Sequence, residues 1–479
     1  MIDIPPPEDL VDGAWTACAD DLGFDLEDPA TGATVARAVG SVPGRAEEAL
    51  AAAERVADAW AATSPERRAD LLDAVAAALD PLVARIAALE SFATGVPIRQ
   101  ALPLGMIVTG AFRLAAAHLR DGGLLAVETR PDGRPVEVHR LPLGPALCLV
   151  PWNAPAPMAA HKVASALAAG CPVILKVSEY APYGTRLLAR VLHETLPAGV
   201  FQLLHGDART GARLAADPRV RAVSFTGGLA GGRSVAAACA EGLRPAQLEL
   251  GGDNPLVVLP DATTENASRA AADLLTTLNG QWCRALGRLI VPRDRQDELM
   301  AAVGERLRAL RAGPPLAEET DFGPLIHSAH LRRVRDAIAG AGGRAVPYGT
   351  MPEEGNFLAP TLITGADPAG EIFGPVAAVL GYDTVDEAVA LANATPYGLE
   401  GYVVGADEER ALAVARRVRA GEVKVNGSSV MSLHLYAPRP AWGLSGLGEE
   451  GTVETLRFFT GARVVGVEGG FALHARQPS

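Results

Sequence analysis

The sequence predicts an α/β protein, because two long blocks of the chain alternate between strand-like and helical patterns. The first block extends from Ala146 to Leu250 and the second from Pro255 to about Gly427. Alternation of this kind is typical of parallel βαβ units with helices on both faces of a sheet. A chain of 479 residues also exceeds what one hydrophobic core accommodates, so two or three domains are expected.

The segment before the first block is predicted to be mainly helical. It is polar and Pro-rich as far as the turn Asp28–Gly32, and Ala/Leu-rich stretches with charges along one face follow. These predicted helices are Arg45–Ala62, Pro65–Gly95 and Met106–Arg120. In Val127–Leu141, Asp132-Gly133 separates two extended runs, which predicts a hairpin that contacts another subunit.

Strands and helices of the two blocks follow from short apolar runs and longer amphipathic runs. The predicted strands of the first block are Ala146–Val150, Pro172–Val177, Val200–His205, Ala222–Thr226 and Gln247–Leu250. The predicted helices between them lie near Met158–Ala169, Tyr183–Thr195, Gly211–Ala216 and Arg233–Glu241. Predicted helices of the second block are Arg293–Arg311, Ser328–Gly340, Asp386–Ala394 and Asp407–Ala420. Near the C-terminus, Val464–Val467 is a candidate extra strand.

Composition excludes several classes of protein. The formal net charge of −13 argues against nucleic acid or an anionic membrane as the main partner. The five cysteines form neither a CxxC pair nor a Cys/His cluster, so neither a metal site nor a disulfide framework is expected. The N-terminus lacks a signal-peptide pattern, and no uninterrupted apolar run reaches membrane-spanning length. We therefore expect a cytoplasmic protein.

Cys283 and Asn153 are candidates for covalent chemistry. Cys283 lies between a helical run and an apolar strand-like run, where a thiol can be both fixed and accessible, although a lone cysteine is more often an inert buried thiol. Asn153 follows a strand and stands in a turn with Pro151 and Pro155. A fixed amide there could stabilise an oxyanion, or it could simply satisfy its own turn.

Other strand ends carry residues suited to a nucleotide or to acid–base chemistry. Lys176 and Glu179 could hold the hydroxyls of a ribose, or form an ordinary ion pair. The glycines of Gly227–Gly232 could approach a phosphate at a helix N-terminus, or form a tight turn. Glu249, before two glycines, could be a desolvated general base, or a surface acid. Glu371–Pro375 suits a ribose hydroxyl and the face of a flat ring, or a packed turn.

In combination and order, these motifs resemble those of the NAD(P)-dependent aldehyde dehydrogenase superfamily over nearly the whole chain. The matching motifs are Pro151-Trp152-Asn153, Lys176–Glu179, Phe225-Thr226-Gly227, Glu249-Leu250-Gly251-Gly252, Gly280-Gln281-Trp282-Cys283 and Glu371–Pro375. Later signatures match at Asn393, Tyr397-Gly398-Leu399 and Ser445-Gly446-Leu447-Gly448. The resemblance implies a Rossmann-like cofactor domain (1–122 and 143–251), an α/β catalytic domain (252–444) and a small β oligomerisation arm (123–142 and 461–479). The arm implies a homodimer or homotetramer.

The resemblance also implies roles for individual residues. Cys283 would attack the aldehyde, Asn153 would hold the oxyanion, Glu249 would activate water to hydrolyse the thioester, and Lys162 would assist proton exit. NAD is the implied cofactor, with NADP possible, because Glu179 would repel a 2′-phosphate. The implied cofactor-binding residues are Trp152, Lys176, Ser178, Glu179, Gly211, Gly227, Gly228, Leu250, Glu371 and Phe373. No metal is implied.

This sequence departs from the family pattern at several positions. Gly228 replaces a hydroxyl residue, Trp442-Gly443 stands where a lysine is common, and Ala154 replaces a bulky residue. The unusual residues His161, Trp282 and Arg284 suggest a polar or aromatic group on the substrate. Three alternatives to acid-forming oxidation remain at this point: a CoA-acylating dehydrogenase, a catalytically silent family member, and a simple thiol esterase.

Overall fold

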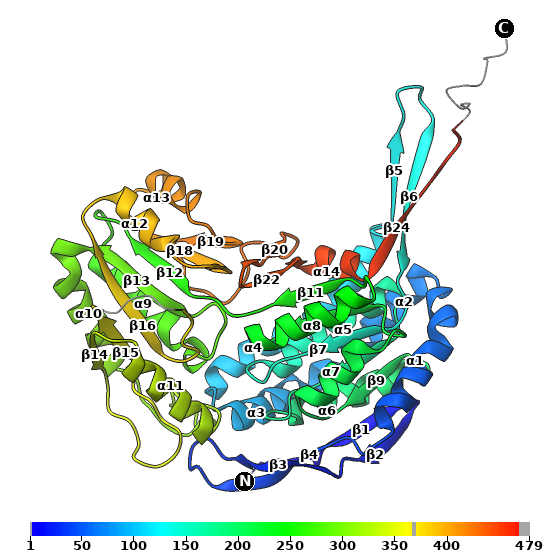
Figure 1. Cartoon of the computed structure of the whole chain (residues 1–479), viewed down its shortest axis with the longest axis horizontal. Coiled ribbons are helices and arrows are strands. Elements are labelled where there is room, and N and C mark those ends of the chain that lie inside the picture. The colour runs from blue at the N-terminus through cyan, green and yellow to red at the C-terminus, as the bar shows by residue number, and fades with distance from the viewer. Residues whose placement is uncertain (1, 366–369, 469–479) are drawn as a thin grey trace.

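The structure, a computed structural model, describes residues 2–365 and 370–468 of the chain. The first of its two open sheets forms one half of the protein (Figure 1). Its strand order is β2-β1-β9-β8-β7-β10-β11-β22, and β7 to β11 are parallel. Strand order reverses direction between β7 and β10, and ligands of such sheets bind at this reversal. The parallel strands are β7 (Ala146–Leu149), β8 (Val173–Lys176), β9 (Phe201–Leu204), β10 (Ala222–Thr226) and β11 (Ala246–Glu249). Beyond the parallel strands, the sheet continues with β1 (Glu8–Val11) and β2 (Ala14–Ala17) at one end and with β22 (Gly446–Leu447) at the other.

The second sheet has the order β14-β15-β16-β13-β12-β18-β19 and is parallel except for β14. Its strands are β12 (Asn254–Val258), β13 (Leu286–Pro292), β14 (Arg344–Pro347), β15 (Thr361–Thr364), β16 (Val376–Tyr382), β18 (Glu400–Val404) and β19 (Glu422–Val425). The helices between them are α9 (Thr264–Thr276), α10 (Gln296–Arg308), α11 (Ser328–Gly340), α12 (Val385–Ala392) and α13 (Glu408–Ala415). Two parallel α/β sheets confirm the predicted fold class.

Helices of the N-terminal half cover the first sheet and differ in part from the prediction. They are α1 (Arg45–Ala61), α2 (Pro65–Leu79), α3 (Val83–Thr94), α4 (Ile98–Arg120), α5 (Pro155–Ala169), α6 (Tyr183–Thr195), α7 (Ala208–Ala216) and α8 (Leu229–Glu241). The single helix predicted over Pro65–Gly95 is wrong, because a 3-10 turn at Asp80–Leu82 divides it. Pro81 lies in that turn, where it has no N–H to continue the helical hydrogen bonds.

Helix α4 begins at Ile98, eight residues before the predicted start at Met106. Pro103 lies in its first half, where the prediction had no helix. By length and composition α4 could cross a membrane, with a mean hydropathy of 1.4 over 18 residues, although Arg113 interrupts its apolar sequence. In this fold α4 packs against α2, α3 and α5, and its apolar face belongs to the core under the first sheet.

The N-terminal segment contains strands that the sequence did not predict. Besides β1 and β2, it forms the hairpin of β3 (Asp20–Glu27) and β4 (Thr34–Gly40). The β3 sequence is rich in aspartate and contains a glycine, which makes it a poor strand former by propensity. Pairing with distant residues determines the structure here, since Leu10 of β1 pairs with Leu203 of β9.

A three-stranded sheet of order β24-β6-β5 projects from the body (Figure 1). Strands β5 (Leu125–Thr129) and β6 (Pro135–Pro142) form the predicted hairpin, and β24 (Thr460–Gly466) pairs with β6 along its length. The predicted extra strand is therefore confirmed, with its start at Thr460. Of the segment predicted to belong to the arm, residues 469–479 lie outside the described part of the chain.

Candidate active site

Most of the predicted site residues line one cavity of about 470 Å³. It lies at the carboxyl ends of β7, β10 and β11, and residues from the second half of the chain close it. The predicted residues on its wall are Trp152, Asn153, Gly227, Gly228, Glu249, Leu250, Cys283, Glu371 and Phe373. Lys162, Lys176, Ser178, Glu179 and Gly211 are not on this wall.

The loop before Cys283 has an unusual backbone that its own sequence stabilises. Leu278 and Asn279 adopt left-handed conformations, with φ of 50° and 58°. The Asn279 side-chain amide donates to the carbonyls of Gly95 (2.8 Å) and Pro324 (3.0 Å), which offsets the strain of this conformation. A Cβ on Gly280 would lie 2.3 Å from the backbone nitrogen of Pro375, so only glycine fits there.

Two asparagines hold the peptide groups around Cys283. The Asn153 Nδ2 donates to the Gln281 carbonyl at 2.9 Å. On the other side, the Asn254 Nδ2 donates to the Cys283 carbonyl at 2.9 Å and to the Ala285 carbonyl at 2.8 Å. The thiol of Cys283 therefore has a fixed position on the cavity wall, with the Asn153 amide beside its loop.

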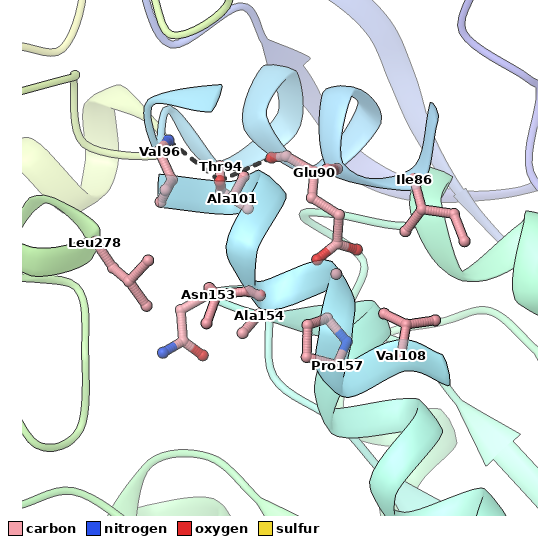
Figure 2. A pocket seen from close by; sticks show the side chains of 13 residues that line it. Ile86, Glu90, Thr94, Val96, Ala101, Val108, Asn153, Ala154, Pro157 and Leu278 are labelled. Carbon is pink, nitrogen blue, oxygen red and sulfur yellow. Dashed lines mark hydrogen bonds between the residues drawn. The ribbon is translucent and has the colours of Figure 1, made fainter. Parts of the chain in front are cut away.

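Behind Asn153 lies a small pocket of about 20 Å³, which has room for about one water molecule (Figure 2). Glu90 of α3 lines it together with Asn153 and Ala154, and its Oε1 accepts a hydrogen bond from the Ala156 backbone N–H at 3.0 Å. That N–H belongs to the first turn of α5, which has no side-chain cap of its own. Burial raises the pKa of Glu90 to about 8. Glu90 therefore supports the Asn153 turn, and nothing near it in the sequence indicated this.

Glu249, the last residue of β11, is buried on the same wall as Cys283. Burial raises its pKa to about 7, and the nearby Glu450 carboxylate adds to the shift. Burial also raises the pKa of the Cys283 thiol, to about 12, and the negative charge of Glu249 acts in the same direction. At neutral pH the cavity thus combines a neutral thiol with a carboxyl group close to its titration midpoint.

Arg284 does not offer its charge to a substrate, contrary to the suggestion drawn from the sequence. Its guanidinium is buried and pairs with Glu400, with Glu422 at 3.1 Å and with Glu249 at 3.4 Å. Lys424 adds a second positive charge to these carboxylates through an ion pair with Glu400 at 2.9 Å. Arg284 therefore links the general-base candidate to a buried cluster of charges.

Lys162 is completely buried and reaches the cavity only through another residue. Its Nζ donates to the Ser224 Oγ at 2.8 Å and to the Glu450 Oε1 at 2.6 Å. Glu450 lines the cavity, whereas Lys162 makes no hydrogen bond to Glu249 among the residues the structure describes. The predicted assistance of Lys162 to Glu249 would therefore have to pass through Glu450.

One side of the cavity has the features of a phosphate and ribose site. Gly227 and Gly228 line it at the N-terminus of α8, and Gly228 caps that helix without a side-chain hydrogen bond. The free backbone N–H groups and the helix dipole favour an anion here. Close by, the Gly252 N–H donates to the Glu371 carboxylate at 3.1 Å. A Cβ on Gly251 would lie 2.0 Å from that carboxylate, so the E-L-G-G glycines allow Glu371 to approach the end of β11.

An aromatic group borders this side of the cavity. Trp152 meets Phe373 edge to face with ring centroids 5.4 Å apart, and His330 of α11 lies 5.4 Å from Trp152. His330 and Arg333 line the cavity but were not predicted as site residues. The amphipathic pattern of Ser328–Gly340 predicted a helix and gave no sign that one of its faces meets the site.

The remaining predicted residues lie further along the same sheet edge. Lys176 ends β8, the neighbour of β7, and its Nζ lies 3.3 Å from the Glu179 carboxylate. Ser178 is buried and accepts a hydrogen bond from the Tyr180 N–H at 3.4 Å, and Gly211 is buried within α7. This arrangement suits a ribose beyond the cavity, and it equally suits a structural ion pair.

Comparisons with known proteins identify the family. The family model "Aldehyde dehydrogenase family" matches residues 15–465. The 3-succinoylsemialdehyde-pyridine dehydrogenase of a Pseudomonas species is 35% identical, over 96% of this chain and 99% of that protein. The vanillin dehydrogenase of Pseudomonas fluorescens is 36% identical, over 98% and 99%.

Solved structures agree with this result. A mutant of aldehyde dehydrogenase C from Pseudomonas syringae, in complex with NAD+ and octanal, superposes with a TM-score of 0.90 at 32% identity, over 97% of this chain and 98% of that one. An aldehyde dehydrogenase of Mycobacterium tuberculosis in complex with NAD+ gives a TM-score of 0.90 at 31% identity, over 97% and 98%. The chain therefore belongs to the aldehyde dehydrogenase family, and its activity is the NAD(P)-dependent oxidation of an aldehyde.

Proposed function

We propose that this enzyme converts its aldehyde to a free carboxylic acid through a covalent adduct on Cys283. The observation that carries the proposal is the presence of Cys283, Glu249 and Asn153 on the wall of one cavity. These residues supply a nucleophile, a base and an amide donor, which are the groups that oxidation through a thioester requires.

In the first step the Cys283 sulfur attacks the carbonyl carbon. With a thiol pKa of about 12, the proton has to leave as the S–C bond forms, and the Glu249 carboxylate is the nearby acceptor. The oxyanion that develops is held by the Asn153 amide and the Cys283 backbone N–H. Removing such a donor typically costs about 3–4 kcal/mol of barrier stabilisation.

When bound, a nicotinamide supplies the hydride acceptor that turns the thiohemiacetal on Cys283 into a thioester. Gly227 and Gly228 would hold its phosphates, and Glu371 a ribose. Once the proton taken from the thiol has left Glu249 for solvent, the carboxylate takes a proton from water, whose oxygen attacks the thioester. The Cys283 sulfur leaves and receives that proton, which releases the acid and restores the thiol. Lys162 would assist this proton exit only indirectly, by holding the Glu450 carboxylate on the cavity wall at 2.6 Å.

Water as the final acceptor distinguishes this proposal from a CoA-acylating reaction. Glu249, with a pKa near neutrality, is a base suited to activating water, whereas transfer to a second thiol has no need of it. A simple thiol esterase would have no use for the glycine turn at the start of α8, nor for Glu371. A catalytically silent protein would have no reason to keep the thiol, the base and the amide on one cavity wall.

NAD is the proposed acceptor in preference to NADP. The Glu179 carboxylate, held by Lys176 at 3.3 Å, would repel a 2′-phosphate and accept from a free 2′-hydroxyl. Initial rates with both cofactors test this choice, and a higher kcat/KM with NADP would contradict it.

We assign residues 1–122 and 143–251 to the cofactor domain, 252–444 to the catalytic domain, and 123–142 with the chain from 461 to the oligomerisation arm. The arm points to a homodimer or homotetramer. A reducing compartment such as the cytoplasm suits the five cysteines, all of which are free thiols.

The deciding experiment is a cofactor-reduction screen over aliphatic, aromatic and carboxylate-bearing aldehydes with the full chain. We expect NADH formation that Cys283→Ala abolishes while cofactor binding is kept. In Glu249→Gln we expect slow turnover, because neither the thiol nor the attacking water would have its proton acceptor. Absence of aldehyde-dependent reduction across the panel would overturn the proposal.

A further inference from the structure

Arg439 brings a positive charge to the wall of the cavity. It belongs to the short strand β20 (Arg439–Pro440), which pairs with β23 (Glu449–Glu450) so that Arg439 lies opposite Glu450. Its side chain lines the cavity and keeps 23% of its surface exposed. Burial lowers the pKa of the nearby His161 to about 4, and the positive charge of Arg439 acts in the same direction.

The charge of Arg439 is only partly balanced. Its guanidinium lies 3.6 Å from one Glu450 oxygen, and within residues 2–365 and 370–468 it makes no hydrogen bond. Glu450 already has a closer partner, since Lys162 reaches its other oxygen at 2.6 Å. One carboxylate therefore faces two cations, Lys162 and Arg439.

The other two arginines on the cavity wall do not serve the same purpose. Arg284 is engaged by Glu249, Glu400 and Glu422, as described above. Arg333 lies beside His330, on the side with the aromatic group and Glu371. The cavity wall also contains apolar side chains, among them Met158, Trp282 and Val430, and the ring of His161.

We propose that Arg439 binds an anionic group at the far end of the substrate, so that the preferred substrates are aldehydes with a carboxylate distant from the carbonyl. The apolar side chains of the wall would accommodate the chain between the two ends, and a guanidinium can bind a carboxylate through two parallel hydrogen bonds. This inference rests on the proposed function, because it assumes that the carbonyl carbon reaches Cys283.

The test compares ω-carboxy aldehydes with alkanals of the same chain length, using the full-length enzyme and NAD. In the wild type we expect kcat/KM to favour the carboxylate series. Arg439→Gln should lower kcat/KM for that series by roughly 10- to 100-fold, mainly through KM, because a charge-assisted hydrogen bond is lost. The alkanals should change less than about threefold, and Arg439→Lys should recover part of the loss. Arg416→Gln, at an exposed arginine directly after α13, is the matched control and should leave both series unchanged.

A second measurement does not depend on turnover. The dicarboxylate products should inhibit oxidation of an alkanal competitively with the aldehyde, and Arg439→Gln should weaken this inhibition by a similar factor. The inference is overturned if carboxylate-bearing aldehydes are no better than alkanals, or if Arg439→Gln affects both series equally. In those cases the alkanals are still oxidised and the proposed function stands, whereas loss of all aldehyde oxidation in the wild type would overturn both.

Discussion

At the scale of single residues, the roles proposed for Cys283 and Glu249 depend on their protonation states. Burial raises the pKa of the Cys283 thiol to about 12, so the thiol is neutral near pH 7 and has to lose its proton during the attack. Glu249 lies in the same buried environment, where its pKa of about 7 makes it half ionised near neutral pH. The sequence predicted both residues from their motifs but could not predict these pKa values, which depend on burial and on Glu450.

The first prediction concerns the pH dependence of the reaction. The active base is the ionised form of Glu249, and its raised pKa means that this form is scarce at low pH. We expect kcat/KM to rise as pH increases through about 7 and then to level off. Glu249→Gln should remove this rise along with most of the activity. A profile that stays flat from pH 5.5 to 8.5 in the wild type would contradict the assignment of Glu249 as base.

The second prediction concerns Arg284, whose three carboxylate partners lie far away in the sequence. Arg284→Leu would leave Glu400 and Glu422 buried with only Lys424 nearby, and the free energy of unfolding should fall by about 3–5 kcal/mol. Denaturant unfolding measures the change, with Arg416→Leu on the surface as control. A loss smaller than about 1 kcal/mol, the range of an exposed pair, would mean that the cluster contributes little.

At the scale of elements, the sequence predicted the parallel strands of the first block within one or two residues, because each is a short apolar run ended by polar or Gly-rich residues. It failed for β1 to β4, whose residues have weak strand propensity and are held by pairing with distant strands. It also failed to place α11 at the cavity, since the helical pattern of Ser328–Gly340 gives no information about its neighbours. Elements with a clear local hydrophobic pattern could be predicted from the sequence. Elements whose formation or position depends on long-range contacts could not.

The third prediction concerns the loop that ends β11. Gly251→Ala would place a Cβ against the Glu371 carboxylate, which must then move away from the Gly252 N–H. We expect the affinity for NAD to fall roughly tenfold, as for the loss of one hydrogen bond to a charged group. Fluorescence titration with NADH measures it. Gly110→Ala on α4 is the matched control, because a Cβ there meets no atom within 4 Å and Gly110 does not line the cavity, so affinity should stay within about threefold.

At the scale of the whole molecule, the arm is the part whose purpose a single chain does not explain. Its strands leave apolar side chains in solvent, with Val127 of β5 59% exposed and Val464 of β24 67% exposed. A three-stranded sheet with this much exposed apolar surface gains stability by packing on a second protein surface. Two distant parts of the chain contribute to it, since β5 and β6 precede most strands of the first sheet while β24 follows the second sheet. An assembly formed through the arm would therefore hold both domains of each subunit together.

The last prediction tests the arm directly. In an assembly the side chains of Val127 and Val464 would be buried, and a carboxylate at either position would have to lose its hydration without a partner. We expect Val127→Asp/Val464→Asp to shift the protein to smaller species in sedimentation velocity, whereas Val464→Thr, which keeps the branched shape, should dissociate far less. Because the cavity residues all come from one chain, the smaller species should still bind NAD with nearly unchanged affinity. A wild-type protein that sediments as a monomer at every concentration would rule out this role for the arm, and the exposed valines would then need another partner.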